Sequence, residues 1–144
     1  MLLRISILAA VLAAFTTVPA VAMARPAVNA SANVELLNGT VRSVGHSARG
    51  RAAVVKLSSG GRRLTLRNFA IDPGPRVRVW LVPKGVSGDS RVDDDYKDLG
   101  ALKGSRGNQE YRIPGSIDLR KYQSVIFWCV PFTQTLARAD LKRS

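Results

Sequence analysis

The 144-residue sequence contains a single cysteine, Cys129, and a single histidine, His46. One cysteine cannot form an internal disulfide, so a folded domain must be held together by hydrophobic burial alone. The C-x-x-C-H motif is missing, which excludes covalent c-type haem attachment. The chain also lacks a Ser-His-Asp arrangement, a recognisable pair of catalytic carboxylates and a phosphate-binding glycine loop. Whether the protein is an enzyme stays open, but these absences argue against a hydrolase or a transferase.

Long hydrophobic runs are absent after the first 24 residues. Before that point, MLLR is a short basic region and ISILAAVLAAFTTVP is an apolar one of the length typical of a secretory signal peptide. The apolar segment is shorter than the roughly 20 residues that span a bilayer, and Pro19 interrupts its end. We predict a signal peptide over residues 1–24, cleaved after Ala24, with Ala22 and Ala30 as alternative cleavage sites. The mature protein is then extracytoplasmic, periplasmic or secreted, without a transmembrane span.

Extended helical periodicity is also absent, and apolar residues instead alternate with polar ones between turn signals. Strands are predicted over residues 39–44, 52–57, 63–67, 76–82, 108–113, 123–130 and 133–141, with an optional one over 34–37. Residues 84–107 are predicted to form a long polar loop, and residues 135–142 fit either a helix or a closing strand. The pattern predicts an all-β fold, a small antiparallel β-sandwich or barrel-like sandwich of about seven to eight strands. Residues 25–37 form an N-terminal lead-in to a β domain over 38–141.

Acidic residues are few, because ten Asp and Glu stand against 22 Lys and Arg, for a formal net charge of +12. In an exported protein this charge favours an anionic envelope component as the partner, and we expect no nucleic-acid binding. Four arginines fall on polar faces of strands expected to be adjacent, and they form a candidate polyanion-binding stripe: Arg63, Arg67, Arg76 and Arg78. A solvated surface is the simpler interpretation of the same charges.

Residues 124–132, SVIFWCVPF, are apolar on both faces of the predicted strand, which indicates a strand covered on both sides. The alternation places two sets of side chains on opposite faces: Val125, Phe127 and Cys129, and Ile126, Trp128 and Val130. Two interpretations of Cys129 remain. It is an inert thiol that fills a gap in the core, or it is a surface thiol activated by arginines. An activated thiol can form a mixed disulfide, cycle through sulfenic acid, or ligate a metal or haem.

We expect no dedicated metal site. His46 lies in a polar stretch, and nothing in the sequence connects it with Cys129. Five aspartates between Asp89 and Asp98 hold half of the acidic residues, but they lack the D-x-D-x-D-G register of a calcium loop. A solvated loop neutralised by neighbouring lysines and arginines is the favoured interpretation, and calcium binding is the alternative.

Four motifs occur in a fixed order: F-x-x-D-x-G-P over residues 69–75, D-L-G-x-L over 98–102, G-x-Q-x-Y-x-I-P over 107–114 and Y-x-S-V-x-x-W-C over 122–129. With these motifs, residues 38–141 resemble the DM-thirteen (DM13) domain, a small extracytoplasmic β domain proposed to act in electron transfer. The resemblance implies that Cys129 is a bare redox thiol or the ligand of a prosthetic group such as haem, with Trp128 as the adjacent aromatic residue.

The resemblance also identifies positions that look architectural: Phe69, Asp72, Gly74, Pro75, Leu99, Gly100, Tyr111, Pro114, Tyr122 and Val125. The chain departs from the family in TLARAD, which lacks the glycine that often follows the last strand. We predict a redox or electron-transfer accessory role centred on Cys129, with a redox protein as partner. Whether haem, another group or no cofactor is bound stays open. The alternative is a non-catalytic extracytoplasmic module that docks to an anionic envelope component through its basic faces.

Overall fold

A computed structural model of the protein describes residues 32–144. The predicted signal peptide and most of the predicted lead-in lie outside this range. The described residues form β1 (Val34–Ser43), β2 (Ala48–Lys56), β3 (Arg62–Ile71), β4 (Val77–Pro83), α1 (Asp89–Val92), β5 (Lys97–Ala101), β6 (Gln109–Ile113), β7 (Tyr122–Cys129), β8 (Gln134–Asp140) and β9 (Lys142–Arg143). Among residues 32–144, no helix is long and apolar enough to cross a membrane.

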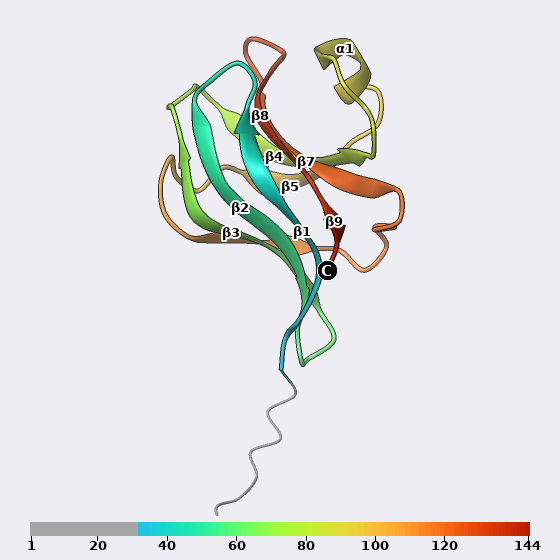
Figure 1. The fold of residues 1–144 in the computed structure, drawn as a ribbon. Helices are drawn as coiled ribbons and strands as arrows, with labels where there is room; N and C mark the ends of the chain where they lie inside the picture. Colours follow the sequence, from blue (N-terminus) through green and yellow to red (C-terminus); the bar gives the residue numbers. More distant parts are fainter. Residues whose placement is uncertain (1–31) are drawn as a thin grey trace, which may run out of the picture.

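The strands pair antiparallel in the order β5-β4-β7-β8-β1-β2-β3-β6, and β9 adds to β1 beside β8. The sheet curls round so that its two ends approach each other, which gives a nearly closed barrel (Figure 1). The predicted all-β antiparallel fold is therefore confirmed, in its barrel-like form. Consecutive strands are not always neighbours, because β4 pairs with β7 and β8 pairs with β1.

The loop that follows the edge strand β5 is hydrogen-bonded to the other edge strand, β6. The backbone N–H of Lys103 donates to the Tyr111 hydroxyl at 3.0 Å, and that hydroxyl donates to Gln109 at 2.5 Å. Gln109 in turn donates to the Gly104 carbonyl at 2.7 Å. These contacts join the loop after β5 to the side chains of β6. They satisfy polar groups that a gap between two edge strands would otherwise leave unpaired.

Bulges supply the curvature that a small barrel needs. In β2 the register shifts between Arg49 and Arg51, and the intervening Gly50 has a φ of 133°. In β5 an extra residue opposes β4 next to Gly100, whose φ is 120°. Both backbone conformations favour glycine, because a side chain at such a φ is strained. The glycine of the D-L-G-x-L motif is thus explained by the bend of this edge strand.

The sheet packs two separate apolar clusters. The inner cluster fills the barrel and includes Leu64, Leu66, Phe69, Val79, Leu81, Val125, Phe127, Cys129 and Leu136. The outer cluster lies on the opposite face of β4 and β7, with residues of the segment between β4 and β5 packed against it: Trp80, Val82, Val86, Val92, Ile126, Trp128 and Val130. Strand β7 is therefore buried on both faces, as its double apolar pattern predicts.

Several boundaries differ from the sequence-based expectation. The predicted loop over residues 84–107 contains α1 and the edge strand β5. The optional strand over residues 34–37 is confirmed and continues without a break into the strand predicted from residue 39, so that both form β1. The ambiguous tail over residues 135–142 is mostly strand β8.

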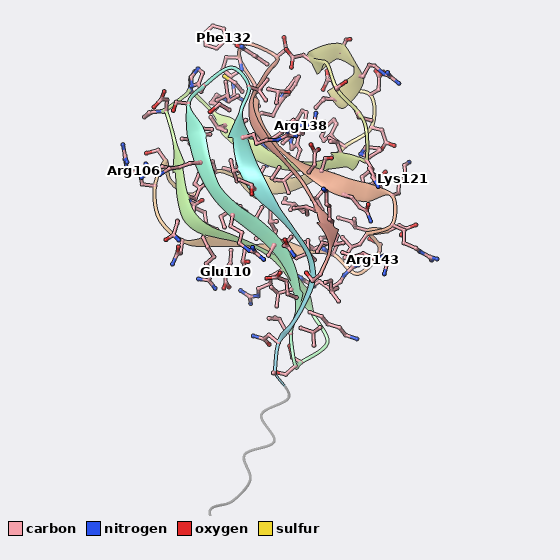
Figure 2. The ribbon with its side chains drawn as sticks, in the orientation of Figure 1. Arg106, Glu110, Lys121, Phe132, Arg138 and Arg143 are labelled. Atoms are coloured by element: carbon pink, nitrogen blue, oxygen red, sulfur yellow. The ribbon has the colours of Figure 1, made fainter. Side chains whose placement is uncertain are left out.

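Phe132 projects from the turn between β7 and β8 and is exposed (Figure 2).

Candidate functional site

Cys129 is the last residue of β7, where it pairs with Val77 of β4 and Gln134 of β8. Its side chain points into the barrel and belongs to the inner cluster with Phe127 and Val125. Only 1% of the residue is exposed. Cys129 therefore lies on the same face of β7 as Val125 and Phe127, as the alternation predicts. A surface thiol is not what the structure shows, because the strand ends beneath another segment rather than at the solvent.

The segment over residues 72–76, which carries the D-x-G-P motif, covers the sulfur. The Cys129 thiol donates a hydrogen bond from Sγ to the Pro75 carbonyl at 3.3 Å. One end of the segment is held by the Asp72 N–H, which donates to the Ser47 carbonyl at 2.9 Å. The other end reaches Arg76, whose φ of 49° lies in the left-handed region that side chains rarely adopt. A thiol that donates a hydrogen bond carries its proton, so in this arrangement Cys129 is not a nucleophilic thiolate.

A prosthetic group or metal at Cys129 does not fit this arrangement. Haem ligation needs the sulfur to face an open cavity, whereas Sγ is enclosed by the core and by Pro75. A groove runs along the same segment, but Cys129 does not line it; its lining includes Pro73, Gly74, Arg76 and Val77. Within residues 32–144, no group of three or more His, Cys, Asp and Glu side chains could hold a metal ion.

His46 lies at the same end of the barrel as Cys129. Its Nδ1 is 3.1 Å from the Asp72 carbonyl, and its ring lies beside Gly74. The only histidine and the only cysteine thus bind carbonyl groups of one segment, at Asp72 and at Pro75. This neighbourhood was not expected from the sequence. Both side chains hold the segment in place, and neither is turned toward a shared ligand.

Trp128 faces away from Cys129, on the outer surface of β7, where it starts a column of stacked aromatic rings. Its ring stacks on Trp80 of β4, with centroids 4.8 Å apart and planes 20° from parallel. Trp80 stacks in turn on Tyr96, with centroids 3.7 Å apart and planes 13° from parallel. Both tryptophans are buried, at 3% and 4% exposed, while Tyr96 is 39% exposed. The column therefore runs from the back of the Cys129 strand to the solvent.

Contacts of the preceding residue hold Tyr96 in the column. Asp95 accepts hydrogen bonds from the Lys121 ammonium at 2.6 Å and from the Tyr122 hydroxyl at 2.7 Å. The hydrogen bonds from Lys121 and then from Tyr122 lower the pKa of the Asp95 carboxyl. The pKa of Lys121 is raised, first by its hydrogen bond to Asp95 and then by the one to Tyr122. Lys121 and Tyr122 lie at the start of β7, so the chain entering β5 is fastened to the strand that carries Trp128. Figure 2 shows Lys121 on that side of the molecule.

The four arginines of the candidate stripe do not form one. Arg63 and Arg67 lie on β3 and Arg78 on β4, and the sheet order separates these strands by β7, β8, β1 and β2. Three of the four also pair with carboxylates. Arg63 and Arg67 both contact Glu110, at 3.1 and 3.8 Å, and Arg78 contacts Asp98 at 2.7 Å. The expectation that the strands are adjacent is therefore wrong, because consecutive strands in this barrel are not neighbours.

The acidic loop is partly neutralised, though by partners other than nearby loop residues. Asp98 pairs with Arg78 of β4, and Asp95 pairs with Lys121 at the start of β7. Asp89 accepts a hydrogen bond from the Thr135 N–H at 2.9 Å, which ties α1 to β8. The carboxylates thus fasten the segment between β4 and β5 onto the outer cluster.

Sequence reasoning missed Trp80 and Tyr96 as members of the site. The alternation in residues 76–82 does place Trp80 opposite Val79, and that in residues 124–132 places Trp128 opposite Cys129. What was missing is that β4 and β7 are neighbours in register, with Trp80 opposite Ile126, so that Trp80 and Trp128 become diagonal neighbours on one face. The position of Tyr96 follows only from the path of the covering segment.

Comparison with known proteins yields one match. A family model described as "Electron transfer DM13" matches residues 40–141, which includes β2 to β8 and the end of β1. No curated protein and no solved structure matches the chain significantly. Two residues of the F-x-x-D-x-G-P motif lie within the matched range and take part in the features above. Phe69 stacks on Phe127 in the inner cluster, with ring centroids 4.9 Å apart, and the Pro75 carbonyl accepts the hydrogen bond of the thiol.

Proposed function

Since the chain belongs to the electron transfer DM13 family, we propose that it is an extracytoplasmic electron-transfer accessory protein whose redox group is Cys129. The family match is the observation that carries this proposal. The arrangement of the thiol supports it in one respect. Cys129 is held as a protonated thiol beneath the segment over residues 72–76, by a single hydrogen bond to a backbone carbonyl. Such a thiol is protected at rest and becomes available when the segment moves.

The proposed chemistry is thiol–disulfide exchange with a partner protein. When the segment lifts, the Cys129 thiol loses its proton to water, and the thiolate attacks a partner disulfide. A new S–S bond joins the two proteins, and one partner sulfur leaves as a thiolate. Because the described domain holds one cysteine, it cannot resolve this mixed disulfide itself. A reduced dithiol protein, distinct from the first partner, must do so. One of its thiolates attacks Sγ of Cys129 and releases the first partner as a dithiol, and its other thiolate then displaces the Cys129 thiolate and closes the donor's disulfide. Two electrons thus pass from the dithiol donor to the first partner through Cys129, which makes the protein an accessory between the two.

The Pro75 segment offers a direct test of this proposal. A small aromatic disulfide that releases a coloured thiolate is added to the folded protein across a range of pH. We expect one thiolate per chain, released slowly in the wild type at a rate set by opening of the segment. Pro75→Gly loosens the segment without removing the carbonyl that accepts the hydrogen bond. We expect this variant to react at least an order of magnitude faster, with intact mass confirming a mixed disulfide at Cys129.

Pro114→Gly is the matched control, because Pro114 lies in the turn after β6, where the Ile117 N–H donates to its carbonyl. It should react at the wild-type rate, and Cys129→Ser should release no thiolate. If the wild type and Pro75→Gly react only as fast as they unfold globally, measured in parallel by loss of tryptophan signal, Cys129 is a packed core residue and the proposal is wrong.

The second candidate function, docking to an anionic envelope component, is supported by the formal net charge of +12. Arg63 and Arg67 lie on β3, Arg78 lies on β4 and Arg76 directly precedes it, and β3 and β4 are not neighbours. This docking would therefore depend on the whole charged surface rather than on one stripe. The two functions are compatible, since a charged surface can hold the protein near the partner that exchanges electrons with it.

A further inference from the structure

The column of Tyr96, Trp80 and Trp128 has a composition that packing alone does not require. Only two tryptophans occur in the chain, and both lie in this column. The three rings are nearly parallel and in contact, with neighbouring centroids 3.7 and 4.8 Å apart. Tryptophan and tyrosine are the two aromatic side chains that give up an electron most readily. Phenylalanine, which fills the corresponding place inside the barrel, does not.

Trp80, the middle ring, has an unusual polar environment. Within residues 32–144, its Nε1 is the one buried side-chain nitrogen or oxygen without a hydrogen-bond partner. Buried tryptophan N–H groups usually have an acceptor, and the lack of one costs stability. It also has a chemical consequence. If Trp80 loses an electron, no base is present to take the proton from Nε1. The ring therefore remains a radical cation, and one electron restores the neutral indole without the transfer of a proton.

The exposed end of the column has the opposite property. Tyr96 is 39% exposed, so its phenol can release a proton directly to water when it is oxidised. A tyrosine that loses its proton in this way is easier to oxidise at neutral pH than either tryptophan. The two other tyrosines do not share these features. The Tyr111 hydroxyl donates a hydrogen bond to Gln109, and the Tyr122 hydroxyl donates one to Asp95. Both tyrosines are buried.

We propose that Tyr96, Trp80 and Trp128 form a single-electron relay between the surface of the domain and the strand that carries Cys129. A one-electron oxidant, such as an oxidised metal centre of a partner protein, removes one electron from Trp128. An electron then passes from Trp80 to Trp128, and another passes from Tyr96 to Trp80. Tyr96 loses its proton to water and ends as a neutral tyrosyl radical, while the oxidant is reduced by one electron. This inference rests on the proposed electron-transfer role, and it adds a one-electron path that is separate from the disulfide exchange at Cys129.

The relay can be tested without a partner protein. A laser pulse ejects one electron from tryptophan into water, where added nitrate consumes it, and this places the radical inside the column. Transient absorption then follows the tryptophan and tyrosyl radicals separately. In the wild type we expect the tryptophan radical to decay as the tyrosyl radical grows, with a rate independent of protein concentration. Tyr96→Phe keeps the stacked ring but removes the oxidisable phenol. It should slow the decay by at least an order of magnitude and abolish the tyrosyl signal.

Two matched variants make the outcome specific to the column. Tyr111→Phe also removes one phenol, from a tyrosine outside the column, and should behave as wild type. Cys129→Ser should leave the transfer between the rings unchanged, so the result stands whether or not Cys129 exchanges disulfides. Equal decay in wild type and Tyr96→Phe, with near-ultraviolet circular dichroism showing that both are folded, would overturn the relay. So would a tyrosyl signal that disappears only in Tyr111→Phe.

Discussion

The side chain of Asp140 joins three strands on the outside of the barrel. Its Oδ1 accepts hydrogen bonds from Arg138 at 2.6 Å and from the Ser124 hydroxyl at 2.8 Å, and its Oδ2 contacts Arg42. Burial by itself would raise the pKa of this carboxyl. The hydrogen bonds from Arg138 and Ser124, together with the charges of Arg138 and Arg42, outweigh burial and lower the pKa below its ordinary value of 3.8.

A lowered pKa in the folded state makes Asp140 a source of acid sensitivity. The stabilisation is fully present above pH 3.8, the ordinary value, and is lost as the pH falls through the lower pKa of the folded state. Asp140→Asn should therefore cost about 1 kcal/mol of unfolding free energy at neutral pH, a value kept small because the pair is partly exposed. The difference from wild type should shrink as the pH falls below 3.8. Urea unfolding at a series of pH values measures both.

Asp118→Asn is the control for this prediction. Asp118 contacts Arg120 at 3.6 Å, and both side chains are more exposed than the Arg138–Asp140 pair. Its replacement should change the unfolding free energy little at any pH. Parallel pH profiles for wild type and Asp140→Asn would contradict the assignment of the acid-sensitive stabilisation to Asp140.

Strand faces were predictable from the sequence, whereas strand neighbours were not. Alternation is a local property, and it correctly placed Cys129 and Trp128 on opposite faces of the strand. The pairing of Val77 with Cys129 joins positions far apart in the chain, and no local pattern encodes it. Strand β5 escaped prediction for a related reason. Lys97 to Ala101 is a short edge strand with no buried residue, so its pairing with β4 rather than its composition makes it a strand.

The DM13 resemblance supplied the fold and the importance of residues 72–75 and 129, but not the state of the thiol. Whether Cys129 is exposed depends on which segment lies over the end of β7, and that is set by the Pro75 contact. The candidate stripe failed for the same physical reason as the missed aromatic column. Both depend on which strands are neighbours, and β3 and β4 are not neighbours in the sheet order.

At the level of strands, Gly39 lies where β1 changes its pairing partner from β9 to β8, and it allows the close approach of the Asp140 backbone there. Residues Leu37 and Asn38 of β1 pair with β9, and residues from Val41 onward pair with β8. Between them, a β-carbon on Gly39 would lie 2.2 Å from the Asp140 carbonyl oxygen. Backbone cannot yield as a flexible side chain can. Gly39→Ala should therefore separate β1 from β8 and lower the unfolding free energy by more than about 2 kcal/mol, measured by urea denaturation.

Gly115→Ala is the matched control, because a β-carbon there meets nothing within 4 Å and its backbone is not in the left-handed region. It should be neutral or raise the unfolding free energy by up to about 1 kcal/mol, since alanine restricts the unfolded chain. Similar unfolding free energies for the two variants would show that the junction of β1, β8 and β9 is more adaptable than its close packing indicates.

The charge of the whole molecule, rather than any one strand, decides how it meets a polyanion. The formal net charge is +12. The four arginines of the candidate stripe are spread around the barrel, and three of them contact Glu110 or Asp98. Figure 2 shows Arg106 on the left of the molecule and Lys121 on the right. Diffuse charge attracts polyanions through the summed field, which salt screens.

Two sets of four arginines separate diffuse attraction from a local stripe. One variant carries Arg→Gln at the candidate positions: Arg63, Arg67, Arg76 and Arg78. The other carries Arg→Gln at four exposed positions on other elements: Arg49, Arg91, Arg120 and Arg143. Each removes the same charge, so both should elute from a sulfated polysaccharide column at the same salt concentration, lower than that of wild type. Earlier elution of the first variant alone would mean that these arginines act together despite the strands between them. In that case β3 and β4 would meet the polyanion as one surface that extends across the two edge strands, β5 and β6.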